Sequence, residues 1–283
     1  MTAHVREFLS PLVLADALAG EIAEGIATAR AAGNRYVLGC PSGRSPHPTY
    51  RALAQIVRAA NLPLGHVILA MMDDYAVREP DGTFGPVPAD AHYSCRRFAR
   101  DEIAGPLSRS APEPIPDRSV WFPAPHTPGA YDDRLRDAGG VDVFILASGA
   151  TDGHVAFNPP GTPADSRTRV IELATSTRLD NLGTFPGFSG IRDVPSYGLS
   201  VGIATITELS KRAVMVVTGA HKRLAYARLT GTGHYDPAWP ATVVHACRDG
   251  SVYADGAAVG KVPVPAHGDD GGGSRREGER ADG

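Results

Sequence analysis

The residues with the clearest capacity for chemistry are Asp152 and His154, which follow the apolar run Val141–Ala147 through a short glycine-containing link. A strand that ends in such a turn leaves the next polar residues at the carboxyl edge of a sheet, where open α/β folds bind ligands. An Asp two residues before a His can hold the imidazole and leave its second nitrogen free for acid and base work near neutral pH. The competing interpretation is a turn aspartate beside a surface histidine, and this segment alone does not separate the two.

A second candidate for proton transfer is Asp73, which directly follows the apolar run His66–Met72. Partial burial at the end of a strand would raise the pKa of this carboxyl and make it a useful base toward a proton on carbon. The alternative is that Asp73, or Asp74 beside it, caps the next element of the chain. Asp73 is therefore a candidate general base with an ordinary structural alternative.

Two further links could bind an anion. The segment Ser42-Gly43-Arg44-Ser45 leads into a helix, so its backbone N–H groups, the helix dipole and its side chains could together receive a phosphate. It lacks the Gly-x-x-x-x-Gly-Lys-Ser/Thr pattern of P-loops, and a plain turn is its alternative. Lys222 follows another apolar run close to a helix start and would suit a phosphate or a carboxylate, although a solvated lysine is the ordinary interpretation.

The elements that must position these loops alternate along the chain. Ser10 and Pro11 mark the start of a helix, whose apolar residues recur every four positions until Gly33. Strands are predicted over residues 35–40, 66–72, 141–146, 168–173, 213–217 and 242–247, and further helices around residues 50–57, 98–103 and 220–229. Strands separated by helices pair in parallel through right-handed crossovers. This order predicts an α/β fold, a three-layer sandwich with a mostly parallel sheet.

Composition excludes several classes of protein. The chain has 283 residues, 42% of them hydrophobic and 21% charged, and its formal net charge is −3. This balance gives no basic surface, so neither nucleic acid nor an anionic membrane is expected as a partner. No apolar run approaches the length of a membrane span and the N-terminus lacks the apolar core of a signal peptide, so we expect a cytoplasmic protein. Three cysteines without Cys-x-x-Cys spacing argue against a disulfide framework and against a zinc site.

We expect residues 1–265 to form a single α/β domain. The sequence beyond them is poor in apolar residues and rich in glycine and charge, which predicts a disordered tail over residues 266–283. Interface surfaces leave no clear mark in the sequence, so a monomer and a homo-oligomer both stay open.

Six ordered segments carry a resemblance that no single motif carries. They are Pro41–Pro46, Met72–Tyr75, Asp152–Asn158, Ser166–Arg169, Val194–Gly202 and Gly219–Lys222. This set resembles the glucosamine-6-phosphate deaminase/isomerase family over roughly Val37 to Val252. That family shares its Rossmann-like fold with the 6-phosphogluconolactonases, so the resemblance says more about the fold than about the reaction.

The resemblance implies an enzyme that converts an amino-sugar 6-phosphate to fructose 6-phosphate and ammonia, with no organic cofactor and no metal. His154, oriented by Asp152, would open the pyranose ring by protonating the ring oxygen. Asp73 would then take the proton from C2 and return it to C1 through a cis-enolamine. The residues that would bind the 6-phosphate are Ser42, Gly43, Arg44, Ser45 and Lys222.

One departure from the family pattern is Pro159, which stands where typical deaminases carry a glutamate that completes the relay with the Asp and His. Either Asp152 alone orients His154, a carboxylate from another loop substitutes, or ring opening is slow. Loss of this glutamate also suits a 6-phosphogluconolactonase, in which His154 would activate water against the lactone carbonyl. The segment Val155–Asn158 is deaminase-like and favours the first reaction, and a drifted phosphosugar sensor is a third hypothesis.

Overall fold

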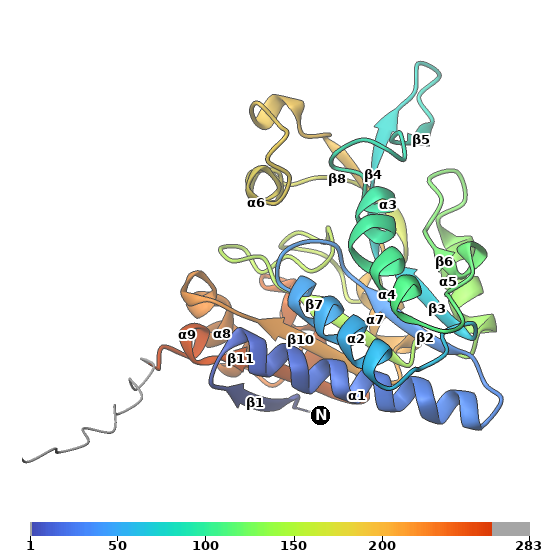
Figure 1. Cartoon of the computed structure of the whole chain (residues 1–283). Coiled ribbons are helices and arrows are strands. Elements are labelled where there is room, and N and C mark those ends of the chain that lie inside the picture. The colour runs from blue at the N-terminus through green and yellow to red at the C-terminus, as the bar shows by residue number, and fades with distance from the viewer. Residues whose placement is uncertain (1, 262–283) are drawn as a thin grey trace, which may run out of the picture.

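The computed structural model describes residues 2–261, and its framework is a seven-stranded parallel sheet with the order β1-β11-β10-β7-β2-β3-β6. Its strands are β1 (His4–Phe8), β2 (Tyr36–Cys40), β3 (Val67–Met71), β6 (Val120–Trp121), β7 (Val143–Ala147), β10 (Ala213–Val217) and β11 (Gly250–Asp255). Parallel neighbours need long crossover connections, and helices lie in these connections (Figure 1). The sheet is therefore the element that brings loops from distant parts of the sequence to one edge.

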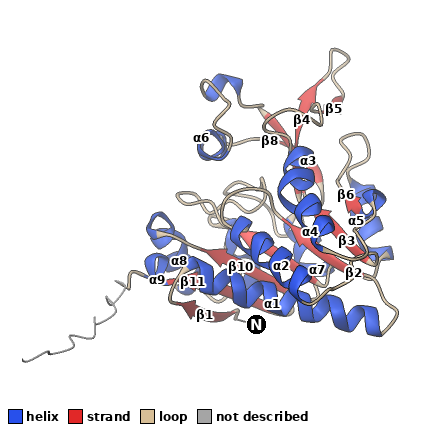
Figure 2. Ribbon diagram, viewed as in Figure 1, coloured by secondary structure: helices blue, strands red, loops and turns tan. Residues whose placement is uncertain are grey.

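Helices cover both faces of this sheet (Figure 2). The helices on one face are α1 (Pro11–Ala31), α2 (His47–Ala59) and α4 (Gly105–Ser110), and those on the other are α5 (Gly129–Asp137), α7 (Ile203–Leu209) and α8 (Arg223–Thr230). Successive strand residues serve opposite faces: Val37 of β2 packs with the second group of helices and Leu38 with the first. The predicted three-layer α/β sandwich with a mostly parallel sheet is confirmed.

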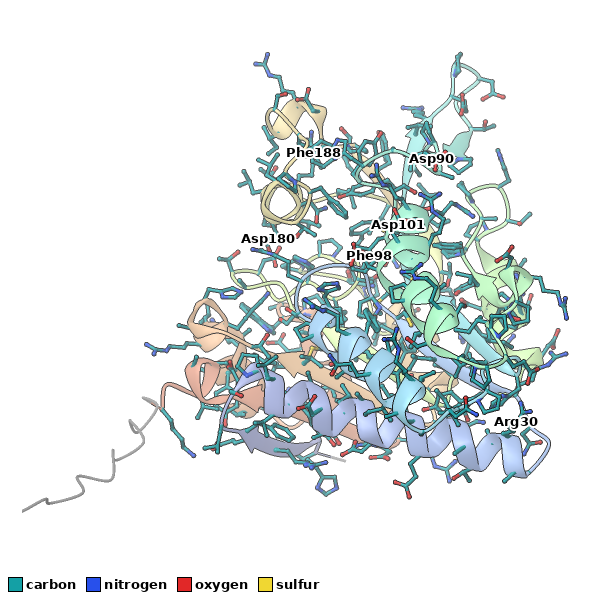
Figure 3. The ribbon with its side chains drawn as sticks, in the orientation of Figure 1. Arg30, Asp90, Phe98, Asp101, Asp180 and Phe188 are labelled. Atoms are coloured by element: carbon teal, nitrogen blue, oxygen red, sulfur yellow. The ribbon has the colours of Figure 1, made fainter. Side chains whose placement is uncertain are left out.

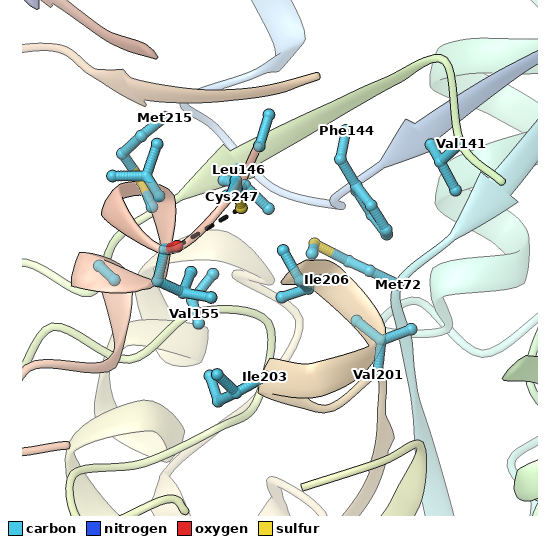
Figure 4. Packing of buried hydrophobic residues seen from close by; sticks show 14 of the residues in the cluster. Met72, Val141, Phe144, Leu146, Val155, Val201, Ile203, Ile206, Met215 and Cys247 are labelled. Atoms are coloured by element: carbon cyan, nitrogen blue, oxygen red, sulfur yellow. Dashed lines mark hydrogen bonds between the residues drawn. The ribbon is translucent and has the colours of Figure 1, made fainter. Parts of the chain in front are cut away.

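The first helix begins where its sequence predicts. Ser10 is the N-cap, and its side chain accepts a hydrogen bond from the backbone N–H of Val13 at 3.3 Å. The apolar positions spaced four apart are all buried against the sheet, and these are Leu14, Leu18, Ile22 and Ile26. Figure 4 shows the core on the opposite face, where Phe144 and Leu146 of β7 pack with Ile206 of α7.

A second, antiparallel sheet was not predicted. Its order is β5-β4-β9-β8, with β5 (Phe84–Pro86), β4 (Asp73–Arg78), β9 (Tyr197–Ser200) and β8 (Arg169–Glu172). The strand expected over 168–173 is present as β8, but it pairs here and not in the parallel sheet. Strand β4 was not predicted because it begins with the carboxylates Asp73 and Asp74. Asp is depleted in strands, so these residues predict the end of the apolar run before them and not the start of a new strand. Asp73 thus begins β4, and a single residue separates it from the end of β3 at Met71.

The strand expected over 242–247 is wrong. Residues Pro240–His245 form a 3₁₀ helix, and the strand that pairs with β10 is β11, which follows it. The helix is buried on every side, so its apolar run carries no periodicity that would separate it from a core strand. Strand β1 was also missed, because its residues are mostly exposed at the edge of the sheet.

The remaining helices are α3 (Cys95–Phe98), the π-helix Ala99–Ala104, α6 (Thr175–Thr184) and α9 (Gly256–Val259), with short 3₁₀ helices at Asp117–Ser119, Ile191–Asp193 and Ala220–Lys222. Helix α6 lies outside the layered body, on the side of the second sheet (Figure 1). Within residues 2–261, none of the helices combines the length and the apolar character that crossing a membrane requires. The predicted tail over 266–283 lies outside the described residues.

Candidate active site

A cavity of about 240 Å³ lies at the carboxyl edge of the parallel sheet, between the loops that follow β2 and β7. These neighbouring strands lead the chain away in opposite directions, to β3 on one side and to β10 on the other, so the cavity occupies the switch point of the sheet. The residues predicted from sequence that line it are Ser42, Gly43, Arg44, Ser45, Asp73, His154 and Lys222. Asp152, the remaining predicted residue, contacts His154.

Asp152 and His154 form a hydrogen-bonded dyad. The Oδ1 atom of Asp152 lies 2.8 Å from Nδ1 of His154 and also accepts the backbone N–H of His154 at 3.1 Å. Burial opposes ionisation of Asp152, but hydrogen bonds from His154 and from Ser176 outweigh it and hold the pKa of Asp152 well below its usual range. Because the carboxylate can only accept, Nδ1 donates and Nε2 of His154 is left for a ligand.

The dyad depends on a glycine at position 149. A Cβ atom there would overlap both Oδ1 of Asp152 and Nδ1 of His154. The backbone N–H of Gly149 donates to the carbonyl of His154 at 2.7 Å, which closes the loop over this space. The glycine in the link after β7 therefore lets the carboxylate and the imidazole meet.

Asp73 is a buried carboxyl with few hydrogen-bond donors. It is 4% exposed, and among residues 2–261 its Oδ1 atom accepts two long hydrogen bonds, from the Ser42 hydroxyl at 3.4 Å and from the Cys95 thiol at 3.5 Å. Burial is the main cause that raises the pKa of Asp73 to about 7, with the charge of Asp74 adding to it and the Cys95 hydrogen bond opposing it. A base poised near neutral pH is suited to taking a proton from carbon.

Asp74, the alternative to Asp73 at this place, is held in a structural role. Its Oδ1 accepts the backbone N–H groups of Tyr75 at 2.9 Å and Cys95 at 3.1 Å, and its Oδ2 lies 3.2 Å from Nε of Arg96. These bonds fix the start of α3 against β4 and turn the Asp74 carboxylate away from the cavity lining. Neither carboxylate is the cap that the alternative expected, because both lie in β4 and the N-cap of α3 is Ser94; Asp74 bonds the first N–H of α3, whereas Asp73 faces the cavity.

Two cationic side chains also line the cavity. Arg44 enters from the loop after β2 and Lys222 from the link after β10, where burial is the main cause that lowers the pKa of the neighbouring His221. Burial is the main cause that lowers the pKa of Lys222, and the charge of Arg44 acts in the same direction. The Lys222 Nζ donates to the carbonyl of Ser148 at 2.5 Å. This grouping of positive charge with the N–H groups of the Ser42–Ser45 loop can bind a dianion.

The segment after the dyad is anchored by Asn158, which is fully buried. Its amide nitrogen donates to the carbonyls of Val201 at 2.7 Å and Val155 at 3.0 Å, and its amide oxygen accepts from Arg169 at 3.0 Å. Between these contacts Ala156 lines the cavity with a positive φ of 49°, a conformation that costs energy for a residue with a Cβ. The Asn158 network holds the backbone in this conformation and so shapes the cavity wall.

Several residues of the site were missed from the sequence. Helix α6 contributes Asp180, Asn181 and Thr184 to the cavity lining, and Ser176 of the same helix donates to Oδ2 of Asp152 at 2.5 Å. In Figure 3 the labelled Asp180 lies on the side of α6 that faces the large sheet. No local pattern links this helix to the dyad, because 24 residues separate Ser176 from Asp152.

The arrangement combines three chemical capacities in one cavity. It holds a buried carboxyl with a raised pKa, an imidazole oriented by an ionised carboxylate, and the cationic side chains of Arg44 and Lys222. Within the described part of the chain, no group of three or more His, Cys, Asp or Glu side chains is arranged to hold a metal ion. Such a set can bind an anionic substrate and move protons between neighbouring atoms.

Comparisons with known proteins point to one family. A family model described as glucosamine-6-phosphate isomerases/6-phosphogluconolactonase matches residues 10–254. The glucosamine-6-phosphate deaminase of Shouchella clausii is 30% identical over 239 residues, which cover 82% of this chain and 88% of the relative. The glucosamine-6-phosphate deaminase of Streptomyces avermitilis is 32% identical over 255 residues, covering 89% and 92%.

Solved structures agree on the architecture. A monomeric glucosamine-6-phosphate deaminase superposes with a TM-score of 0.78 and 26% identity, over 91% of this chain and 99% of that one. A 6-phosphogluconolactonase from Shewanella baltica superposes with a TM-score of 0.65 and 17% identity, over 89% of this chain and 97% of that one. The second likeness concerns the fold alone.

Proposed function

Because the chain belongs to the glucosamine-6-phosphate isomerase/6-phosphogluconolactonase family, we propose that it converts glucosamine 6-phosphate and water to fructose 6-phosphate and ammonia. Membership in the family confirms the resemblance drawn from the six sequence segments. The observation that carries the choice of reaction is Asp73, a buried carboxyl with a raised pKa that lines the same cavity as His154. A base of this kind is what proton abstraction next to a carbonyl group requires.

The first step in this proposal is opening of the sugar ring by His154. With Nδ1 bonded to Asp152, the Nε2 atom accepts the proton of the C1 hydroxyl and gives it to the ring oxygen as the C1–O bond breaks. The aldehyde form results, with no net change in the protonation of the imidazole. The ionised Asp152 stabilises the imidazolium that forms in passing.

The second step is transfer of a proton between neighbouring carbons by Asp73. The ionised carboxylate takes the proton from C2 while the aldehyde oxygen takes a proton from water, which gives a cis-enolamine. Asp73 then returns its proton to C1, and loss of an N–H proton to water leaves an imine at C2 and a hydroxyl at C1. Water adds to this imine, ammonia departs, and the ketone of fructose 6-phosphate is formed. One carboxylate can serve both carbons because C1 and C2 are adjacent and the phosphate contacts fix the chain.

The phosphate contacts in this proposal come from the loop after β2 and the link after β10. Ser42, Gly43, Arg44 and Ser45 would bind one side of the dianion and Lys222 the other. Gly43 has a positive φ of 103°, a conformation of this loop that favours glycine. We expect the enzyme to act in the cytoplasm, since a phosphorylated sugar cannot leave water to cross a bilayer.

The pH dependence of the reaction should follow the ionisation of Asp73. Because its pKa is raised to about 7 and only the carboxylate can accept a proton, kcat/KM should fall about tenfold for each pH unit below that value. Rates of ammonia release between about pH 5.5 and 8.5 check this. A profile that stays flat down to about pH 5 would exclude Asp73 as a base with a raised pKa.

The Cys95 thiol offers a control for this assignment. Its hydrogen bond lowers the pKa of Asp73, so Cys95→Ala should move the acid limb of the profile to higher pH. The phosphate of the substrate titrates near pH 6, and its own ionisation does not depend on Cys95. Cys247→Ala is the matched variant, because among residues 2–261 the Cys247 thiol bonds only the carbonyl of Val243, and it lies outside the cavity lining. In Cys247→Ala, the acid limb of the pH profile of kcat/KM should stay at the pH of the wild type.

One observation keeps 6-phosphogluconolactone hydrolysis as a second candidate. Pro159 has no side chain that could relay a proton to the dyad, and a lactonase needs His154 only to activate water. Ammonia release from glucosamine 6-phosphate should therefore be measured beside hydrolysis of 6-phosphogluconolactone on one preparation. Ammonia with fructose 6-phosphate supports the deaminase, lactone hydrolysis alone supports the second reaction, and binding of the phosphosugar without turnover would support a sensor.

A further inference from the structure

The dyad has a hydrogen-bond partner that the sequence did not reveal. Both oxygens of the Asp152 carboxylate are engaged: Oδ1 by His154, and Oδ2 by the hydroxyl of Ser176 at 2.5 Å. Pro159 offers no side-chain donor or acceptor, and within residues 2–261 no carboxylate other than Asp152 hydrogen-bonds His154. The second point of attachment for Asp152 therefore comes from α6.

Helix α6 reaches from the dyad to the phosphate loop. Ser176 is its second residue, whereas Asn181 and Thr184 near its other end line the cavity. At that end, a Cβ on Gly183 would lie 3.5 Å from a guanidinium nitrogen of Arg44. One short helix thus contacts both the group that would open the ring and the loop that would bind the phosphate.

The far end of α6 also carries a donor that a ligand could use. The amide nitrogen of Asn181 is buried and has no hydrogen-bond partner among the described residues, although its residue lines the cavity. A buried donor without a partner costs free energy, and a bound ligand oxygen would remove that cost. We therefore expect bound substrate to accept a hydrogen bond from Asn181 and so to hold α6 more tightly against the cavity.

We infer that Ser176 is a positioning residue: from α6, its hydroxyl holds the Asp152 carboxylate that orients His154. Through this bond, the orientation of the imidazole depends on how α6 packs against the bound substrate. The inference rests on the proposed function for its role in turnover. A carboxylate held at both oxygens cannot rotate, so it presents Oδ1 to Nδ1 of His154 in one direction. The neutral imidazole is thereby kept in the tautomer that leaves Nε2 for the sugar.

The test compares three variants in one helix. Ser176→Ala removes the hydroxyl, Ser176→Thr keeps it, and Thr175→Ala removes a neighbouring hydroxyl that is exposed and makes no side-chain hydrogen bond within the described residues. We expect Ser176→Ala to lower kcat about tenfold with KM within about twofold, as for loss of one hydrogen bond to a charged group. The threonine variant should recover most of kcat, and Thr175→Ala should match the wild type.

A second readout does not depend on turnover. Imidazole ¹⁵N shifts, assigned by comparison with His154→Gln, report which nitrogen of His154 carries the proton in the unliganded protein. We expect the Nδ1–H tautomer in the wild type and in Ser176→Thr, and a larger Nε2–H fraction in Ser176→Ala. This separates a change in the dyad from a general loss of structure, which would affect all ten histidines.

The two readouts distinguish failure of this inference from failure of the proposed function. A protein that releases no ammonia but shows the tautomer change would lose the proposed reaction and keep Ser176 as a positioning residue. Wild-type kcat together with a wild-type tautomer in Ser176→Ala would overturn the inference. An equal loss of kcat in Thr175→Ala and in Ser176→Ala would also overturn it, because the loss would then come from a change in α6 as a whole and not from removal of the Ser176 hydroxyl.

Discussion

Asp73→Asn should lower the kcat of ammonia release by about 10³-fold, the middle of the range for removal of a general base. Asparagine has nearly the same shape as aspartate, but its amide cannot accept a proton from C2 of the sugar. Substrate binding should change little, because the amide oxygen of asparagine can still accept the Ser42 hydroxyl and the other proposed phosphate ligands do not bond Asp73. Exchange of the C2 proton with solvent deuterium, measured with the same samples, should fall in parallel with kcat.

The stability of this variant distinguishes loss of a base from loss of the fold. The pKa of Asp73 is raised by burial from an ordinary value to about 7, so its contribution to folding is full below the ordinary value and is lost as pH rises through 7. At pH 8 the wild type carries the cost of a buried charge, and the neutral amide of the Asp73→Asn variant would not. The melting temperature of the variant at pH 8 should therefore equal or exceed that of the wild type.

Asp81→Asn supplies the matched control for Asp73→Asn. Asp81 lies in the exposed turn before β5, outside the cavity lining, and the same chemical change there should leave kcat unaltered. Turnover close to that of the wild type in Asp73→Asn would remove Asp73 from the role of base and with it the proposed route of proton transfer.

The two carboxylates of the site differ in environment, and this difference suits the roles that we propose for them. Asp73 meets only a hydroxyl and a thiol in a dry position, whereas Asp152 receives two N–H groups and a hydroxyl. The first environment favours the neutral acid and the second favours the anion, so their pKa values move in opposite directions. A group that must accept and return a proton and a group that must stay charged are thus both available near neutral pH.

The parallel sheet could be predicted because its central strands are fully buried. Strands β2, β3 and β10 are continuous apolar runs bounded by loop residues, and such runs can be recognised in the sequence alone. The second sheet could not be predicted in the same way. Its strand β4 opens with two carboxylates, and its ladder pairs Asp73 with Ser200, a partner more than 100 residues away.

The candidate site shows the same division between what the sequence predicts and what it does not. Asp73, His154 and Lys222 each follow a buried strand, so their meeting at one edge follows from parallel pairing. Ser176 and Cys95 reach the carboxylates from α6 and α3. No propensity or spacing connects those helices to the sheet edge, which is why sequence reasoning found residues that line the cavity and missed those that bond Asp73 and Asp152.

His154→Gln should show a loss that depends on the form of the substrate. Glutamine can still bond Asp152 but cannot carry a proton from the C1 hydroxyl to the ring oxygen, so kcat for glucosamine 6-phosphate should fall about 10²-fold or more. An open-chain analogue that can form neither the pyranose nor the furanose ring, such as the 4,5-dideoxy sugar, bypasses this step. Its turnover, which needs Asp73, should fall much less in the same variant.

The decisive quantity is the ratio between the loss of kcat with glucosamine 6-phosphate and the loss of kcat with the open-chain analogue. His126→Gln provides the control, because His126 is exposed and lies outside the cavity lining, and it should leave both rates unchanged. A variant His154→Gln that lost the same factor with the open-chain analogue as with the ring form would show that His154 acts after ring opening. Ring opening would then fall to solvent or to another group, and the Asp152–His154 dyad would serve the later release of ammonia.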